Sequence, residues 1–247
     1  MKRTAEVTED QRPDPKPRKR VHLWQAYLMW DELVQMRKRH ILRVSSIEAG
    51  KSNMNKQLET DFMERMNLDK MIDNAKKTMV EYGKDDAPDV WKWAASVKGL
   101  GEGGLLAQLI AQVDDITSFT NVSKLWRFAG QAVIDGKAER NKPGEKSHKN
   151  NRLQAVCWNI GEQFVRQQTP GYSDMYYQEK TRLRALHPEK EGNLYSDGHI
   201  HNMAKRKTVK IFLQHLWLVW RESEGLPVTM PYAIDILHHA DYIEPQR

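Results

Sequence analysis

Apolar residues recur at helical spacing along the first third of the chain, and this periodicity constrains the fold more than any other feature of the sequence. Between residues 21 and 46 they stand at Leu23, Tyr27, Trp30, Val34, Ile41 and Val44, with no internal glycine or proline. Side chains three, four or seven positions apart share one face of an α-helix, whereas a strand alternates its faces. The segment 21–46 therefore predicts one long helix.

A second helical run follows a short break. Residues 50–53 (Gly-Lys-Ser-Asn) form the break, and helical spacing resumes through Leu58, Phe62, Met66, Met71, Val80 and Tyr82 up to Gly83. Glycine often ends a helix because it adopts a left-handed backbone at no steric cost. We expect the two runs to form a long helical hairpin over 21–83, with coiled-coil-like packing.

The remainder of the chain has the same helical character. Further helices are predicted over 90–97, 102–113, 121–131, 149–168, 172–186, 202–223 and 231–239, and no run alternates as strands do. The predicted fold class is all-α. The polar stretch from Gly83 to Pro88 predicts a boundary between the helical hairpin of 21–83 and a multi-helix domain over 84–247.

Residues 1–20 have too few apolar side chains to offset the entropy of ordering. They carry Pro13, Pro15 and Pro17 among charged residues and end in a basic cluster from Lys16 to Arg20. We predict a flexible basic tail. No apolar run typical of a signal peptide follows Met1, so we expect a cytoplasmic protein.

The apolar content suffices for a core, but no stretch predicts a membrane span. Hydrophobic residues make up 39% of the 247, and the stretch Ile211–Trp220 is interrupted by Gln214 and His215. We therefore expect no membrane partner. Cys157 is the single cysteine, which excludes an intramolecular disulfide and a four-cysteine zinc site. Its apolar neighbours predict that it is buried.

A glycine-rich turn between two apolar helical segments is the most informative motif. It runs from Ala94 to Ile110 and predicts a helix-hairpin-helix element over Val97–Val113. The glycines let a phosphate approach the backbone closely, and the positive end of the second helix's dipole lies behind the turn. The candidate phosphate-binding residues are Lys98, Gly99, Gly101, Gly103 and Gly104. A dinucleotide-binding turn would need a preceding strand. A helix junction that merely packs is the structural alternative.

Two basic segments add to this signal. The chain has a net charge of +6, which favours a polyanionic partner. The first segment is a loop with candidate contacts at Lys137, Arg140, Lys142, Lys146, Lys149 and Arg152. The second, Lys205-Arg206-Lys207 with Lys210 nearby, opens the predicted helix 202–223. Both suit contact with a phosphate backbone, the alternative being solvated surface.

Other polar and aromatic clusters are assigned to structure. His199 and His201 resemble a pair of metal ligands, but nothing fixes a third ligand. We therefore predict neither a metal site nor a cofactor. The aromatic residues Tyr172, Tyr176, Tyr177, Trp217 and Trp220 stand at helical spacing beside apolar partners. We expect them in the core rather than stacked on bases.

An ordered series of motifs carries a family resemblance. Val97-Lys98-Gly99-Leu100-Gly101 is followed by Asp115-Ile116-Thr117-Ser118-Phe119, by Phe128-Ala129-Gly130 and by Asn151-Arg152-Leu153. In this order, over roughly 90–222, the chain resembles the C-terminal domain of the IS-one-ten-type insertion-sequence transposases, which contains a helix-hairpin-helix. The resemblance implies nucleic-acid binding, and the hairpin at 21–83 resembles the long helices that precede this domain in the family.

The chain departs from the family in two ways. The family's N-terminal catalytic domain has a ribonuclease-H-like fold with a carboxylate cluster, and the residues before 90 offer neither its strands nor its length. The resemblance also implies a nucleophilic serine in the basic loop. Ser147 is the single serine between Gln131 and Asn151, and it is displaced toward the helix start. A serine hydroxyl without a neighbouring base is a weak nucleophile.

The sequence thus favours a DNA-binding protein related to mobile-element transposases and not an enzyme by itself, with RNA as the alternative partner. A second hypothesis is a serine-dependent strand transferase that uses Ser147 and takes its carboxylates from a partner chain. A third is a helical interaction module, in which the hairpin 21–83 binds another protein or a second copy of the chain.

Overall fold

The computed structural model describes residues 17–100, 104–134, 137–139, 144, 149–187, 195–228 and 245. Its helices are α1 (Val21–Glu48), α2 (Lys56–Met66), α3 (Leu68–Asp86), α4 (Pro88–Ala95), α5 (Leu105–Val113), η1 (Ile116–Ser118), α6 (Val122–Phe128), α7 (Asn151–Arg166), α8 (Tyr172–Leu186) and α9 (Asp197–Ser223). The strands β1 (Val133–Ile134) and β2 (Lys137–Ala138) form one short antiparallel ladder. The predicted all-α class is confirmed. The predicted helix 231–239 lies outside the described residues.

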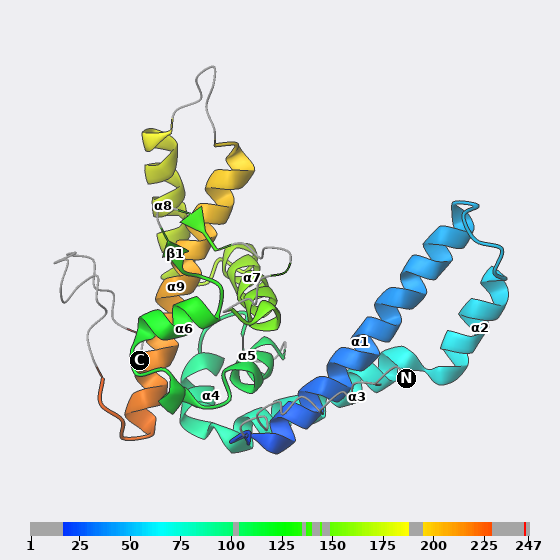
Figure 1. Cartoon of the computed structure of the whole chain (residues 1–247), viewed down its shortest axis with the longest axis horizontal. Coiled ribbons are helices and arrows are strands. Elements are labelled where there is room, and N and C mark those ends of the chain that lie inside the picture. Colours follow the sequence, from blue (N-terminus) through cyan, green and yellow to red (C-terminus); the bar gives the residue numbers. More distant parts are fainter. Residues whose placement is uncertain are drawn as a thin grey trace, which may run out of the picture.

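The first three helices form an arm that leads away from the others (Figure 1). Helix α1 packs along α3, as the predicted helical hairpin requires. The expectation of one continuous second helix is wrong, because α2 ends at Met66 and Asn67 adopts a left-handed backbone with φ +50° before α3 begins. Asparagine is one of the few residues that tolerate this conformation.

Gly83 lies inside α3 instead of ending the second run. A Cβ at this position would stand 2.8 Å from Cζ3 of Trp91, so the missing side chain lets the indole of α4 lie against α3. Only Ala87 separates the two helices, and Pro88 starts α4 at a position where its absent N–H is not needed. The predicted boundary at 83–88 is therefore a tight helix junction.

A single apolar core crosses this junction. Leu23 of α1 and Met79 of α3 belong to the same buried cluster as Leu106 and Ile110 of α5. All nine residues of α5 are buried, so this helix is the centre of the fold. The outer arm has its own small cluster of Met63, Leu68 and Ile72.

Helix α9 packs against α4, α6 and α7, and it lies beside α8 (Figure 1). Trp217, Trp220, Tyr172 and Tyr176 are buried, as expected for core residues, whereas Tyr177 is 49% exposed. The helix begins at Asp197 and not at 202, since Ser196 caps it by accepting a hydrogen bond from the amide of His199. The Lys205–Lys207 cluster consequently lies within α9 and not at its start.

The end of the basic tail docks onto the domain. Arg20 is buried, its amide donates to Asp114 Oδ1 over 2.9 Å, and its guanidinium pairs with Glu224 at 3.1 Å. These two carboxylates attract the basic end of the segment predicted to be flexible. Residues 1–16 lie outside the described part of the chain. Within the described ranges, no helix has the length and apolar character needed to cross a membrane.

The contact between α7 and α9 leads to a prediction on stability. A Cβ added at Gly161 would stand 2.6 Å from Lys205 Cγ and 3.0 Å from Val209 Cγ2. We expect Gly161→Ala to lower the free energy of unfolding by about 2 kcal/mol, because the helices must separate. Urea denaturation measures this. Gly198→Ala is the control, since its nearest neighbour would be 4.0 Å away. Equal stability of the two variants would contradict close α7–α9 packing.

Candidate nucleic-acid interface

The turn between α4 and α5 depends on two glycines with left-handed backbones. Gly99 has φ +93° and Gly104 has φ +76°, conformations that other residues adopt only with strain. A Cβ at Gly99 would also lie 3.3 Å from Gln167 Cγ, so the turn runs close to the end of α7. Gly101 and Gly103 lie outside the described residues. The structure thus describes the two ends of the predicted hairpin turn.

Two hydrogen bonds fix the backbone of the turn. Thr169 Oγ1 donates to the Lys98 carbonyl over 2.9 Å, and the Leu100 amide donates to the Val97 carbonyl over 3.2 Å. Val97 and Leu100 are buried, whereas the side chain between them, Lys98, is exposed. The turn therefore presents Lys98 to solvent from a fixed backbone.

An open groove of about 1020 Å³ is lined by both this turn and α7. Its lining comes from α4, the following turn and α5 at Ala95, Val97, Lys98, Gly99 and Leu105, and from the α7 side at Trp158, Asn159, Glu162, Gln163, Arg166 and Gln167. Leu105 is the first residue of α5, so the positive end of that helix's dipole borders the groove. The predicted hairpin residues and the exposed side of α7 form one concave surface.

The free charges of the groove are positive. Lys98 and Arg166 are exposed, and neither pairs with a carboxylate among the residues that the structure describes. Glu162 is the acidic lining residue, but its carboxylate pairs with the Lys205 ammonium and lies 3.5 Å from His201 Nε2. The hydrogen bond from Lys205 is the main reason that the pKa of Glu162 is lowered. The groove therefore suits an anion at Lys98 and Arg166.

The predicted basic cluster on α9 is engaged inside the protein. Lys205 is only 2% exposed, and burial lowers its pKa although Glu162 opposes that effect. Arg206 donates to the Gly130 carbonyl over 3.1 Å, and Lys207 pairs with Glu179 at 2.8 Å. Lys210 lies over the Trp126 ring, 4.3 Å from its centroid. These four cations contact other parts of the protein, and none of them lines the groove. Lys205 is connected to the groove only through its ion pair with the lining residue Glu162.

The predicted basic loop is described only at its ends. The backbone of Lys137 lies in β2, Lys149 donates to the Glu139 carbonyl over 3.0 Å, and Arg152 lies 3.6 Å from Asp31 of α1. The remaining candidates of the loop lie outside the described residues, namely Arg140, Lys142, Lys146 and Ser147. Nothing in the described geometry places the loop candidates beside the groove.

The histidines and the cysteine have structural surroundings. His201 Nδ1 lies 2.6 Å from the Tyr176 hydroxyl, and the His199 ring meets Tyr195 edge-on. Among the described residues, no group of three or more His, Cys, Asp or Glu side chains is placed to hold a metal ion. Cys157 is buried as predicted, and burial raises its pKa to about 12, so its thiol stays protonated at neutral pH.

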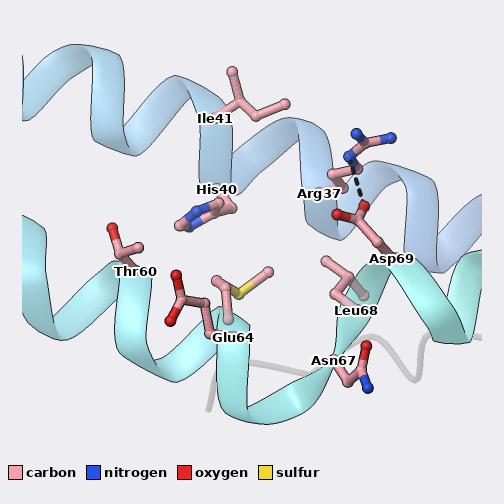
Figure 2. A pocket seen from close by; sticks show the side chains of 9 residues that line it. Arg37, His40, Ile41, Thr60, Glu64, Asn67, Leu68 and Asp69 are labelled. Carbon is pink, nitrogen blue, oxygen red and sulfur yellow. Dashed lines mark ion pairs between the residues drawn. The ribbon is translucent and has the colours of Figure 1, made fainter.

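A second cavity, of about 460 Å³, lies in the arm between α1 and the α2–α3 junction. Figure 2 shows Arg37 on α1 paired with Asp69 on α3, at 3.1 Å. On α2, Glu59 accepts a hydrogen bond from Arg43 over 2.6 Å and lies 3.1 Å from His40, and these hydrogen bonds, that of His40 first, lower the pKa of Glu59. Ion pairs thus hold the outer arm across a gap that apolar side chains only partly fill.

Sequence reasoning missed the α7 wall of the groove. Trp158 is 48% exposed, although its neighbours Val156 and Cys157 are buried. The available signal was the set of amides at Asn159, Gln163 and Gln167, which share one helical face beside Arg166.

No family model, no curated protein and no solved structure matches the chain.

Proposed function

We propose that this protein binds DNA through the phosphate backbone, using the hairpin turn at Gly99 and the cations Lys98 and Arg166, together with the basic loop that begins at Lys137. The resemblance to transposase C-terminal domains points to the same activity. We further propose that the chain is related to these mobile-element proteins and acts in binding, without strand chemistry of its own.

One observation carries the proposal. A turn with left-handed glycines presents Lys98 beside an open groove, and Arg166 faces the same groove from α7. A phosphate backbone needs an accessible surface with fixed positive charges and with main chain that it can approach closely. In this groove the acidic Glu162 is neutralised by Lys205, so it does not repel the anion.

Salt dependence of binding tests the proposal. A protein that neutralises phosphates releases counterions, so its affinity for a labelled duplex falls as salt is raised, with a logarithmic slope near −0.9 per contacted phosphate. We expect this slope in fluorescence anisotropy. No binding to DNA at low salt, or an affinity that does not change with salt, would overturn the proposal.

The glycine turn gives a matched pair of variants. Gly99→Ala forces a side chain into a left-handed backbone and should cost roughly 1–2 kcal/mol of stability. It also displaces Lys98, so duplex affinity should fall severalfold. Gly50→Ala is the control, because Gly50 has φ +68° and no neighbour within 4 Å of its Cβ position, in the turn between α1 and α2. An equal loss of DNA affinity in both variants would argue against binding at the hairpin.

A further inference from the structure

Trp158 is an exposed aromatic ring held in a fixed position. It lines the groove beside the hairpin turn and also a smaller cavity of about 360 Å³, which Lys205 lines as well. The Lys205 ammonium lies 2.8 Å from the ring centroid, and Lys205 is not part of the groove lining. Lys205 therefore contacts the ring next to the smaller cavity, and 48% of the Trp158 side chain remains exposed beside this contact.

The cation is itself fixed by its surroundings. Lys205 is buried and forms an ion pair with Glu162, and its aliphatic stem crosses α7 at Gly161, where a Cβ would stand 2.6 Å from Lys205 Cγ. Since Trp158 is restrained before any ligand arrives, binding of a planar ligand does not carry the entropic cost of ordering this side chain. The side chain remains 48% exposed, which is unusual for the largest apolar residue type.

The rest of the groove supplies the groups that a nucleotide needs. Asn159, Gln163 and Gln167 line it, and each amide offers both donors and acceptors, as the edges of bases require. Lys98 and Arg166 provide the positive charge for phosphates. A ring face, amides and cations thus meet in one open space.

We infer that this groove binds an unpaired nucleotide segment, with one base stacked on Trp158, its edge on the α7 amides and its backbone on Lys98 and Arg166. Within a duplex each base face is covered by its neighbours, so only an unstacked base can use the ring. The inference rests on the proposed function and adds a preference for unpaired over fully paired nucleic acid.

Trp158→Ala tests this inference in the full-length protein. Base–aromatic stacking contributes about tenfold or more in affinity, so the variant should lose about tenfold in binding to single strands and much less in binding to a duplex, which offers no free base face. Trp158→Phe should retain most of the single-strand affinity. Tyr177→Ala is the matched control, because Tyr177 is an equally exposed aromatic, at 49%, and does not line the groove.

The readout uses labelled single-stranded DNA, single-stranded RNA of the same sequence, and duplex DNA, each with one 2-aminopurine. Stacking on Trp158 should quench this base in the tighter of the two single-strand arms, and the quenching should disappear in Trp158→Ala. Salt-dependent duplex binding without any Trp158-dependent single-strand affinity or quenching would overturn the inference alone. Absence of binding to all three would overturn the proposed function.

Discussion

Replacing Trp217 by alanine is expected to remove about 3–5 kcal/mol of folding stability, a large part of the total for a domain of this size. The side chain is 1% exposed in the main apolar core, and its indole Nε1 donates to the Phe119 carbonyl over 2.7 Å. The substitution removes both the packing and this link between α9 and the segment after η1. Urea denaturation followed by circular dichroism gives the difference.

Two further tryptophan variants separate the contributions of the N–H donor and of burial to this loss of stability. Trp217→Phe keeps most of the buried ring and loses the N–H donor, so it should be less destabilising than alanine. Trp158→Ala removes the same side chain from an exposed position and should cost only about 1 kcal/mol, mainly from the contact with Lys205. If Trp217→Ala were no more destabilising than Trp158→Ala, Trp217 would not be packed in the core as described by its 1% exposure.

The double variant Lys98→Ala/Arg166→Ala is expected to bind duplex DNA roughly 50-fold more weakly at about 0.1 M salt. Each cation is assigned one phosphate, and the loss of two contacts should also make the logarithmic salt slope shallower by about 2. Both side chains are exposed on the groove, so the fold should be unaffected. Anisotropy titrations across a series of salt concentrations measure both quantities.

A charge-matched control separates position from net charge. Lys38→Ala/Lys51→Ala removes two positive charges from exposed positions in the outer part of the arm, on α1 and in the turn that follows it. We expect this variant to change the affinity far less than the groove variant, since charges beyond a Debye length are largely screened. Equal losses of duplex affinity in the two double variants would show that binding depends on the net charge of the protein and not on the two cations of the groove.

The helices could be predicted from the sequence because they follow from local periodicity and caps. The break at Asn67 was not predicted, since one left-handed residue leaves the apolar spacing of the flanking helices intact. Gly83 was misread as a helix end because its role, to admit Trp91, depends on a neighbouring helix. The start of α9 at Asp197 was missed because its first turn has only Ile200 as an apolar residue.

The part of the candidate site that lies in a local sequence motif could be predicted, whereas the part that depends on packing between helices could not. Lys98 and Gly99 stand in a recognisable turn motif, so the sequence indicates them directly. Lys205 belongs to a run of cations, but its burial is decided by Glu162 and by the gap at Gly161, both on another helix. Trp158 follows a buried cysteine, and its exposure results from the way α7 packs against α9. Sequence gives charges and rings, whereas tertiary packing decides which of them face a ligand.

Hydrogen exchange of the full-length protein with and without bound DNA locates the binding surface on the chain. If DNA binds at the groove, exchange slows on binding in the segment around Val97–Gly104 and along the exposed side of α7, with no change in α2. Protection confined to the arm helices α1–α3, with none at the hairpin turn, would contradict binding at the groove.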